Sequence, residues 1–149
     1  MRLLHRILPT GRYLFLRKII DSPLCSFCKQ EEETITHLFW GCTVIQSFWS
    51  NLQTLIKETC INRMHFKLSE ALVLFGVTDN TITDKVIDFF ILLAKFYFYR
   101  CRWGENAPNL NVFLRILKDW YLVERYLHIV TNRSSDFDID WLPYKALIL

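Results

Sequence analysis

Hydrophobic residues recur at helical spacing in one stretch of the chain after another. In residues 43–58, isoleucine, leucine and aromatic residues repeat at intervals of three and four, with polar residues between them. This pattern is typical of an amphipathic helix. Residues 69–75, followed by Gly76, and residues 109–130, which begin at the potential cap Asn109, follow the same rule. On the last of these helices we expect the inward-facing residues to be Phe113, Ile116, Leu117, Trp120 and Leu127.

A nearly all-apolar stretch covers residues 83–103. Four polar residues interrupt it at intervals of four, seven and seven, so on a helix they share one side. They are Asp84, Asp88, Lys95 and Arg102. We expect them to form a narrow solvated stripe on an otherwise buried helix. Two shorter helices are predicted near the amino terminus, over residues 10–18 with Thr10 as cap and over residues 34–40, the second ending at Gly41.

The composition agrees with a well-packed helical chain. Of the 149 residues, 52% are hydrophobic and 15% aromatic, with only 4 glycines and 4 prolines. Such values exclude a disordered chain and disfavour a turn-rich β fold. No stretch reaches the roughly 18 charge-free apolar residues of a membrane span, and the first residues do not resemble a signal peptide. We therefore expect an intracellular protein of the nucleus or cytoplasm, with reduced cysteines and no membrane partner.

Four potential zinc ligands lie close together in the sequence. Two residues separate Cys25 from Cys28, eight separate Cys28 from His37, and four separate His37 from Cys42. Three thiolates and one imidazole make a closed tetrahedral set of the structural kind, with no position left for a catalytic water. The alternatives are cysteines and a histidine buried without metal, or a disulfide between the first two cysteines.

The remaining cysteines and histidines are scattered. Cys60 and Cys101 have no companions at ligand spacing, and we expect them to be small buried side chains. His5, His65 and His128 are likewise isolated, so none is expected to be a ligand or a base.

Basic residues concentrate in two places, although the net charge is only +3. The first eighteen residues hold five basic residues and no acid, and residues 97–103 contain a mixture of aromatic and basic side chains. Basic groups can hold phosphates and aromatic rings can stack on unpaired bases. The alternative is a solvated helix face over buried aromatics. The candidate nucleic-acid contacts are Arg12, Arg17, Lys18, Arg100 and Arg102.

Residues 24–49, which run LCSFCKQEEETITHLFWGCTVIQSFW, resemble a known zinc-binding segment. It follows the polymerase domain in reverse transcriptases of non-LTR retrotransposons, the long interspersed elements. The shared features are the cysteine pair, Glu33-Thr34, His37-Leu38-Phe39, Cys42 and Phe48-Trp49. The resemblance extends over residues 7–52. A retroviral nucleocapsid knuckle has four residues between the second cysteine and the histidine, so its base-stacking mode is not carried over to this chain.

The resemblance implies a carboxy-terminal piece of the element's second reading-frame protein. Residues 1–20 would be basic lead-in helices from the upstream reverse transcriptase, residues 21–60 the zinc-binding domain, and residues 61–149 a carboxy-terminal helical region. The expected fold is all-α, with a small Cys3His zinc knuckle between helices and a helical tail. Structural Zn2+ would be held by Cys25, Cys28, His37 and Cys42.

The implied function is a non-catalytic accessory domain that assists RNA or DNA binding in target-primed reverse transcription. The chain lacks polymerase and endonuclease motifs, so we expect neither an enzyme nor a small-molecule substrate. Asp136, Asp138 and Asp140 alternate as on a strand, but no partner motif supports a metal site. Two alternatives stay open: a zinc-stabilised module that docks on the polymerase domain of a parent polyprotein, and a decayed element copy without function.

Overall fold

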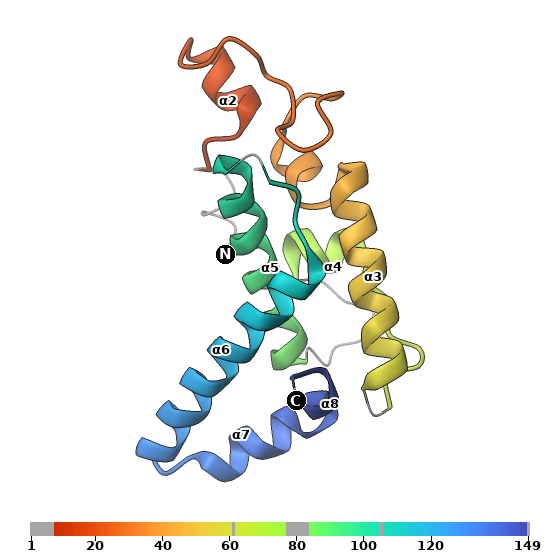
Figure 1. The fold of residues 1–149 in the computed structure, drawn as a ribbon, viewed down its shortest axis with the longest axis vertical. Coiled ribbons are helices and arrows are strands. Elements are labelled where there is room, and N and C mark those ends of the chain that lie inside the picture. Colours follow the sequence, from red (N-terminus) through yellow and green to blue (C-terminus); the bar gives the residue numbers. More distant parts are fainter. Residues whose placement is uncertain (1–7, 61, 77–83, 105, 149) are drawn as a thin grey trace.

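A computed structural model describes residues 8–60, 62–76, 84–104 and 106–148, and helices dominate this part of the chain (Figure 1). In chain order the elements are α2 (Gly11–Leu16), the π turn η1 (His37–Gly41), α3 (Thr43–Thr59), α4 (Glu70–Phe75), α5 (Lys85–Trp103), α6 (Leu110–Val130), α7 (Ser134–Trp141), the 3-10 turn η2 (Leu142–Tyr144) and α8 (Lys145–Ile148). The described residues contain no strand, only one isolated antiparallel bridge between Leu24 and Glu32. The all-α prediction is confirmed. None of the described helices is both long and apolar enough to span a bilayer.

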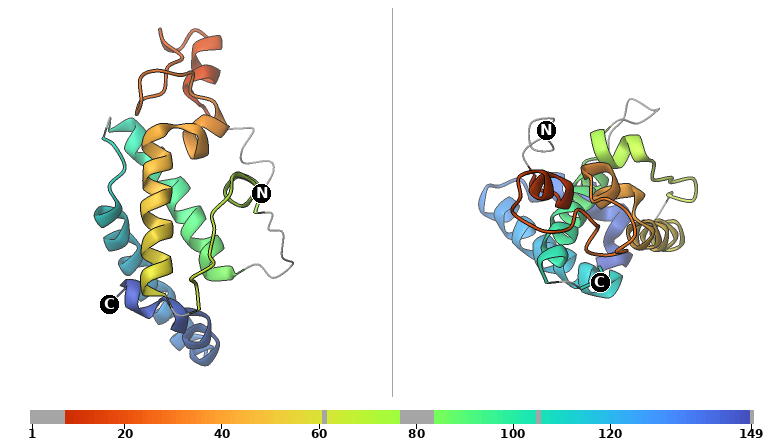
Figure 2. Two further views of the ribbon diagram at one scale, coloured as in Figure 1. Left: turned by 90° about the vertical axis from the view of Figure 1, so that its right-hand side faces the viewer. Right: turned by 90° about the horizontal axis from the view of Figure 1, so that it is seen from above.

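The molecule is elongated, and different elements form its two ends. Helix α2 and the loop that follows it lie at one end, while α7 and α8 lie at the other (Figures 1 and 2). The long helices α3, α5 and α6 form the body between them. The cysteine-containing segment therefore lies at one tip, above the helical core.

Polar caps fix where the helices begin and end. The side chains of Thr10, Ser69, Asp84 and Asn109 accept backbone N–H groups at the starts of α2, α4, α5 and α6. Each cap satisfies donors that the first helical turn leaves unpaired. Gly76 ends α4 in the left-handed conformation, with φ of 68°, which glycine adopts at little cost. The helices predicted over residues 10–18, 69–75 and 109–130 are thus confirmed, although α2 already ends at residue 16.

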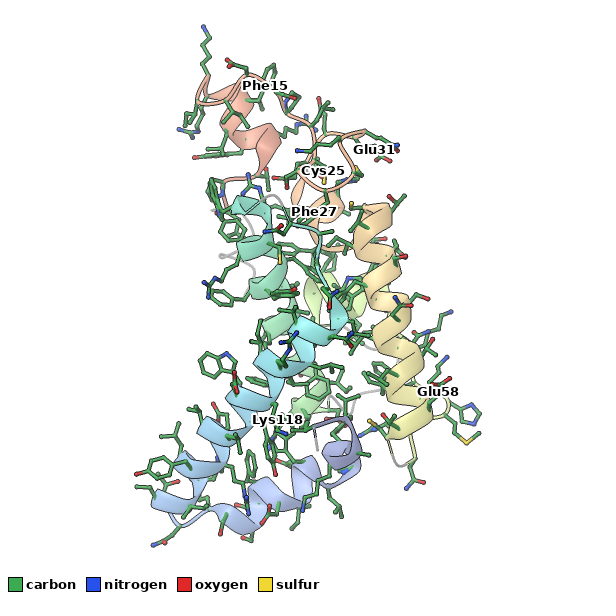
Figure 3. The ribbon with its side chains drawn as sticks, viewed as in Figure 1. Phe15, Cys25, Phe27, Glu31, Glu58 and Lys118 are labelled. Carbon is green, nitrogen blue, oxygen red and sulfur yellow. The ribbon has the colours of Figure 1, made fainter. Side chains whose placement is uncertain are left out.

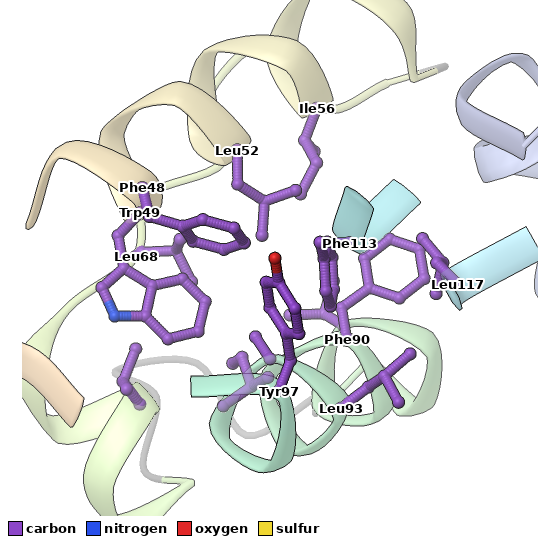
Figure 4. Packing of buried hydrophobic residues seen from close by; sticks show 14 of the residues in the cluster. Phe48, Trp49, Leu52, Ile56, Leu68, Phe90, Leu93, Tyr97, Phe113 and Leu117 are labelled. Atoms are coloured by element: carbon purple, nitrogen blue, oxygen red, sulfur yellow. The ribbon is translucent and has the colours of Figure 1, made fainter. Parts of the chain in front are cut away.

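Aromatic rings join the three long helices. Phe48 of α3 lies edge-on to Phe98 of α5 and to Phe113 of α6, with ring centroids 4.8 Å and 5.4 Å apart. Trp49 meets Phe98 in the same way at 5.2 Å. Edge-to-face pairs add about 0.5–1.5 kcal/mol each beyond area burial. Figure 4 shows Phe48, Trp49 and Phe113 in the core, with Leu52 and Ile56 of α3 beside them.

A second aromatic cluster holds the carboxy-terminal helices. Trp141 of α7 lies 5.0 Å from Tyr121 of α6 and 5.7 Å from Phe90 of α5, measured between ring centroids. Tyr144 of η2 lies 5.4 Å from Phe90. The tail expected around Trp141 is therefore an ordered pair of helices that covers the far end of the core.

The strand-like alternation of Asp136, Asp138 and Asp140 has a different structural meaning. All three lie on helix α7, where residues two apart point in different directions. Asp136 and Asp140, four residues apart, share one face of the helix, and Asp138 points to another.

The polar stripe expected on α5 is wrong in its carboxy-terminal half. Lys95 is only 7% exposed and Arg102 only 8% exposed, while Asp84 and Asp88 are half-buried. Arg102 is buried because its guanidinium pairs with the buried carboxylate of Glu33. The Lys95 ammonium lies 5.7 Å from the centre of the Phe39 ring, and burial lowers the pKa of Lys95 to about 8.

The inward face of α6 also differs from the prediction. Phe113 and Leu117 are buried as expected, and Tyr121 continues that face four residues further on. Trp120 and Leu127 are instead 43% and 49% exposed. Ile116 is half-buried and packs against the core, so the inward prediction holds for Phe113, Leu117 and Ile116 but not for Trp120 and Leu127.

Replacing Lys95 with methionine tests the cost of its burial. The folded-state pKa of about 8 lies below the ordinary value of 10.5, so the unfolded chain binds the proton more tightly and charge burial opposes folding below pH 8. Lys95→Met is expected to raise the unfolding free energy at pH 7 by on the order of 2 kcal/mol. The gain should vanish as pH rises from 8 to 10.5.

Urea titrations across this pH range measure the effect, with Lys118→Met on the exposed side of α6 as the matched control. A gain that stays constant above pH 10.5, or equal gains in both variants, contradicts the assignment to charge burial.

Candidate metal centre

A short hairpin brings the first two cysteines together. The Cys25 N–H donates to the Glu31 carbonyl at 2.8 Å, and the Glu33 N–H donates to the Pro23 carbonyl at 2.9 Å. These bonds close the loop that contains Cys25 and Cys28. Inside it, the Phe27 N–H donates to Cys25 Sγ at 3.4 Å, a contact that favours the thiolate form.

The loop turns back through Lys29, the residue after the second cysteine. Lys29 has φ of 57°, in the left-handed region, which costs a non-glycine residue on the order of 1 kcal/mol. Its N–H donates to the Cys25 carbonyl at 3.0 Å. The left-handed turn at Lys29 thus reverses the chain just after Cys28, which leaves the sulfurs of Cys25 and Cys28 on the same side of the loop.

A π turn positions the other two ligands. The Cys42 N–H donates to the His37 carbonyl at 2.9 Å, five residues back. On an α-helix residues five apart would point about 140° away from each other, whereas the wider turn lets His37 and Cys42 face one point. The expected helix over residues 34–40 therefore exists in this wider form. It ends at Gly41 as predicted, but Gly41 is not left-handed, and the chain leaves the turn through the extended residue Cys42.

Side chains from α3 satisfy carbonyls of this turn. Trp49 Nε1 donates to the Phe39 carbonyl at 2.8 Å, and Gln46 Nε2 donates to the Trp40 carbonyl at 2.7 Å. A π turn has few intrahelical partners for its carbonyls, and a buried carbonyl without a partner costs about 1–3 kcal/mol. The tryptophan of the Phe48-Trp49 motif is therefore a support for the ligand-bearing turn.

The four potential ligand atoms meet at one point. Those of Cys25, Cys28, His37 and Cys42 all lie within 4.8 Å of one another. Cys25 Sγ is 3.8 Å from Cys42 Sγ, and Cys28 Sγ is 3.4 Å from His37 Nε2. Tetrahedral zinc with ordinary bond lengths requires about 3.8 Å between two sulfurs and about 3.6 Å between sulfur and nitrogen. The geometry therefore fits zinc and confirms the predicted ligand cluster, which lies near the tip where Figure 3 labels Cys25.

Burial and charge give the site the character of a structural centre. Cys25 and Cys42 are completely buried, and His37 is nearly so. A hydrogen bond from Cys25, together with N–H groups of Ile45 and Val44 at the start of α3, lowers the pKa of the Cys42 thiol to about 5. The same shared proton, and then burial, raise the pKa of Cys25. Zinc would replace that proton, since it binds thiolates. All five cysteines are free, so the disulfide alternative does not apply.

A carboxylate supports the histidine from its other side. His37 Nδ1 lies 3.4 Å from Glu31 Oε2. A carboxylate at Nδ1 fixes the imidazole so that Nε2 faces the metal and becomes a better donor to it. Glu31, the first of three consecutive glutamates, thus belongs to the metal centre.

Glu33 connects the metal loop to the rest of the molecule. Its carboxylate is 1% exposed, and Oε1 lies 2.6 Å from Arg102 Nε. The same oxygen accepts the Gly11 N–H at 2.7 Å, while Oε2 accepts the Ser26 N–H and hydroxyl, both at 3.3 Å. Arg102 Nη1 in turn donates to the Pro9 carbonyl at 2.8 Å. The buried carboxylate of Glu33 therefore connects three parts of the chain: the start of α2, the loop that contains Cys25 and Cys28, and the end of α5.

Close packing at this point leaves little room for a side chain on Gly11. A Cβ on Gly11 would lie 3.1 Å from Glu33 Cβ and 3.1 Å from the Pro23 carbonyl. Sequence reasoning did not identify Glu33 as a link, although the Glu-Thr pair was visible in the motif.

The candidate nucleic-acid contacts fall into two groups. Arg12, Arg17, Lys18 and Arg100 are exposed at or near the zinc-binding end. Arg102 is committed to Glu33 in the interior. Of the scattered residues, Cys60 is buried, Cys101 is half-buried and His65 is exposed. His128 lies beside Glu124, and Arg2, His5 and Arg6 lie outside the described residues.

The family comparison agrees with the geometry. Residues 1–49 match a family model described as zinc-binding in reverse transcriptase. The matched stretch contains all four ligands, the lead-in helix and Trp49. This third of the chain is thus similar to the zinc-binding domain of reverse transcriptases, and its four potential ligands form a Cys3His cluster that suits structural zinc. No curated protein and no solved structure matches the chain.

Glu33→Gln tests the link at the zinc-binding end. The amide keeps the size of the side chain, but it leaves the buried Arg102 without its counter-charge and turns one acceptor into a donor. Breaking a buried ion pair in this way costs about 3–5 kcal/mol, and urea unfolding measures the loss.

Glu32→Gln is the matched control, because Glu32 forms an exposed pair with Arg12 at 3.6 Å and such pairs contribute at most about 1 kcal/mol. Equal losses of stability in the two variants would argue against a special role for Glu33.

Proposed function

We propose that the zinc-binding end is a non-catalytic accessory domain of a LINE-type reverse transcriptase. In this proposal it holds RNA or DNA during target-primed reverse transcription, and the polymerase performs the chemistry. The family match supports the reverse-transcriptase context. The closed ligand set supports a structural metal, since no coordination position is left for substrate or water.

The observation that carries the proposal is the surface of α2. Arg12 of α2 and the two residues that follow its last residue Leu16, Arg17 and Lys18, are exposed there, and α2 contains no acidic residue. Tyr13 and Phe15 are exposed between them. Phosphates would meet the cations and unpaired bases would stack on the rings.

Contacts within the protein position the basic and aromatic side chains around α2. The Arg17 guanidinium lies over the Tyr13 ring, 4.4 Å from its centroid. The Gly11 N–H donates to Glu33, so the start of α2 is fixed to the metal loop. A fixed surface loses less conformational entropy on binding than a free basic tail. Zinc would then contribute to binding indirectly, by holding the helix that makes the contacts.

Arg100 would extend the surface along α5. It is exposed, and its guanidinium lies 5.9 Å from the centroid of the Phe96 ring. Arg102 acts as a positioning residue in this account, because its guanidinium pairs with Glu33.

Docking on the polymerase is the second candidate. Leu92, Phe96 and Trp103 are exposed on α5, and large apolar side chains exposed on one helix can form an interaction surface. A chain that binds no nucleic acid by itself but associates with the polymerase domain through these residues would favour docking.

Replacing Arg17 and Lys18 together with alanine tests the nucleic-acid proposal. If each cation holds one phosphate, the double variant should bind single-stranded RNA or DNA on the order of 10-fold more weakly at moderate salt. The slope of log affinity against log salt should also fall by about 1.4. Fluorescence anisotropy of labelled oligonucleotides measures both.

The matched control is Lys118→Ala with Arg125→Ala, which removes the same charge from exposed positions on α6. Absence of binding by the unmodified chain, or an equal loss in the control, would refute the proposal.

A further inference from the structure

Helix α5 has one narrow exposed face. Its exposed side chains are those of Lys85, Leu92, Phe96, Arg100 and Trp103, and all its other residues are buried or half-buried. On a helix of 3.6 residues per turn these five positions occupy a sector of about 80°. The face therefore combines two cations with three large apolar side chains, two of them aromatic, and it contains no acid.

An arginine lies between the two aromatic rings of this face. Phe96 and Trp103 are 55% and 62% exposed, and seven residues place them about 10.5 Å apart along the helix axis. The Arg100 guanidinium lies 5.9 Å from the centroid of the Phe96 ring. A nucleic-acid strand has the same alternation, because phosphates join each base to the next. A base stacked on each ring would bring the phosphates between them close to Arg100.

Contacts with neighbouring residues hold the Trp103 ring, although most of it is exposed. The Arg102 guanidinium lies 4.9 Å from the centroid of this ring, and the Tyr99 ring meets it edge-on at 6.0 Å. Arg102 is itself held by Glu33 and by the Pro9 carbonyl. A ring that is already positioned loses less conformational entropy when a base stacks on it. The metal loop thus helps to position Trp103 through Arg102.

We propose that the exposed face of α5 stacks unpaired nucleobases, so that the chain binds a single strand in preference to a duplex. A duplex hides the faces of its bases in the helical stack, whereas a single strand offers them to aromatic side chains. The inference rests on the proposed nucleic-acid function. It extends that function to a helix outside residues 1–49, the part that matches the family model.

The α5 face lies close to the basic surface of α2. Arg102 donates to the carbonyl of Pro9, which directly precedes Thr10, the cap of α2. Figure 1 shows α2 directly above this end of α5. One strand could therefore place phosphates on the cations around α2 and bases on the rings of α5.

Replacing Phe96 and Trp103 together with leucine tests the inference, because leucine keeps an apolar surface but removes the planar rings. Fluorescence anisotropy compares three labelled probes: a single strand, its duplex, and a strand of equal length without bases. The unmodified chain should bind the single strand most tightly. The double variant should bind it on the order of 10-fold more weakly. Its affinity for the strand without bases and its salt dependence should not change, since no phosphate contact is removed.

The matched control is Trp120→Leu with Tyr126→Leu, which removes two exposed rings from α6, and circular dichroism confirms that each variant is folded. Unchanged single-strand binding by the Phe96→Leu, Trp103→Leu variant would overturn the inference, as would an equal loss in the control or on the strand without bases. If replacement of Arg17 and Lys18 still weakens binding, the proposed function survives that outcome. An unmodified chain that binds none of the three probes would refute both.

Discussion

Four ligand atoms converge on one point at the tip of an otherwise helical protein, and the local backbone is arranged to permit it. A strained hairpin presents two sulfurs, and a π turn presents the imidazole and the third sulfur within 4.8 Å of the others. Three thiolates packed so closely repel one another unless a cation is shared among them. Metal binding at such sites supplies about 10–16 kcal/mol of folding free energy, far more than the cost of the left-handed Lys29 or the wide turn.

The metal loop affects the rest of the molecule through Glu33. This side chain sits between the second and third ligands in sequence, and its carboxylate holds α2 on one side and Arg102 of α5 on the other. Trp49 and Gln46 fasten the π turn to α3. The metal loop thus contacts both α2 and the helical body, and bound zinc would stabilise these contacts.

Local features could be predicted from the sequence, because they depend on neighbours in the chain. The ligand spacing, the caps at Thr10 and Asn109, and the glycine end of α4 all belong to this kind. The burial of Lys95 and Arg102 could not be predicted, since it depends on which element covers α5. The Arg102 bond to the Pro9 carbonyl spans 93 positions. Periodicity also did not separate Trp120 from Tyr121, since both lie on apolar faces of α6 and only packing decides which one is buried. The division at residues 20 and 60 stays a prediction.

The most direct test of this account is zinc content measured together with amide hydrogen exchange. The purified chain should contain one zinc ion, and removing it with a strong chelator should abolish protection in α2 and in residues 25–42. Cys42→Ala should show the same loss without chelator. A chain that binds no zinc, or one whose protection at this end is unchanged after the metal is removed, would contradict the claim that Cys25, Cys28, His37 and Cys42 form the structural centre.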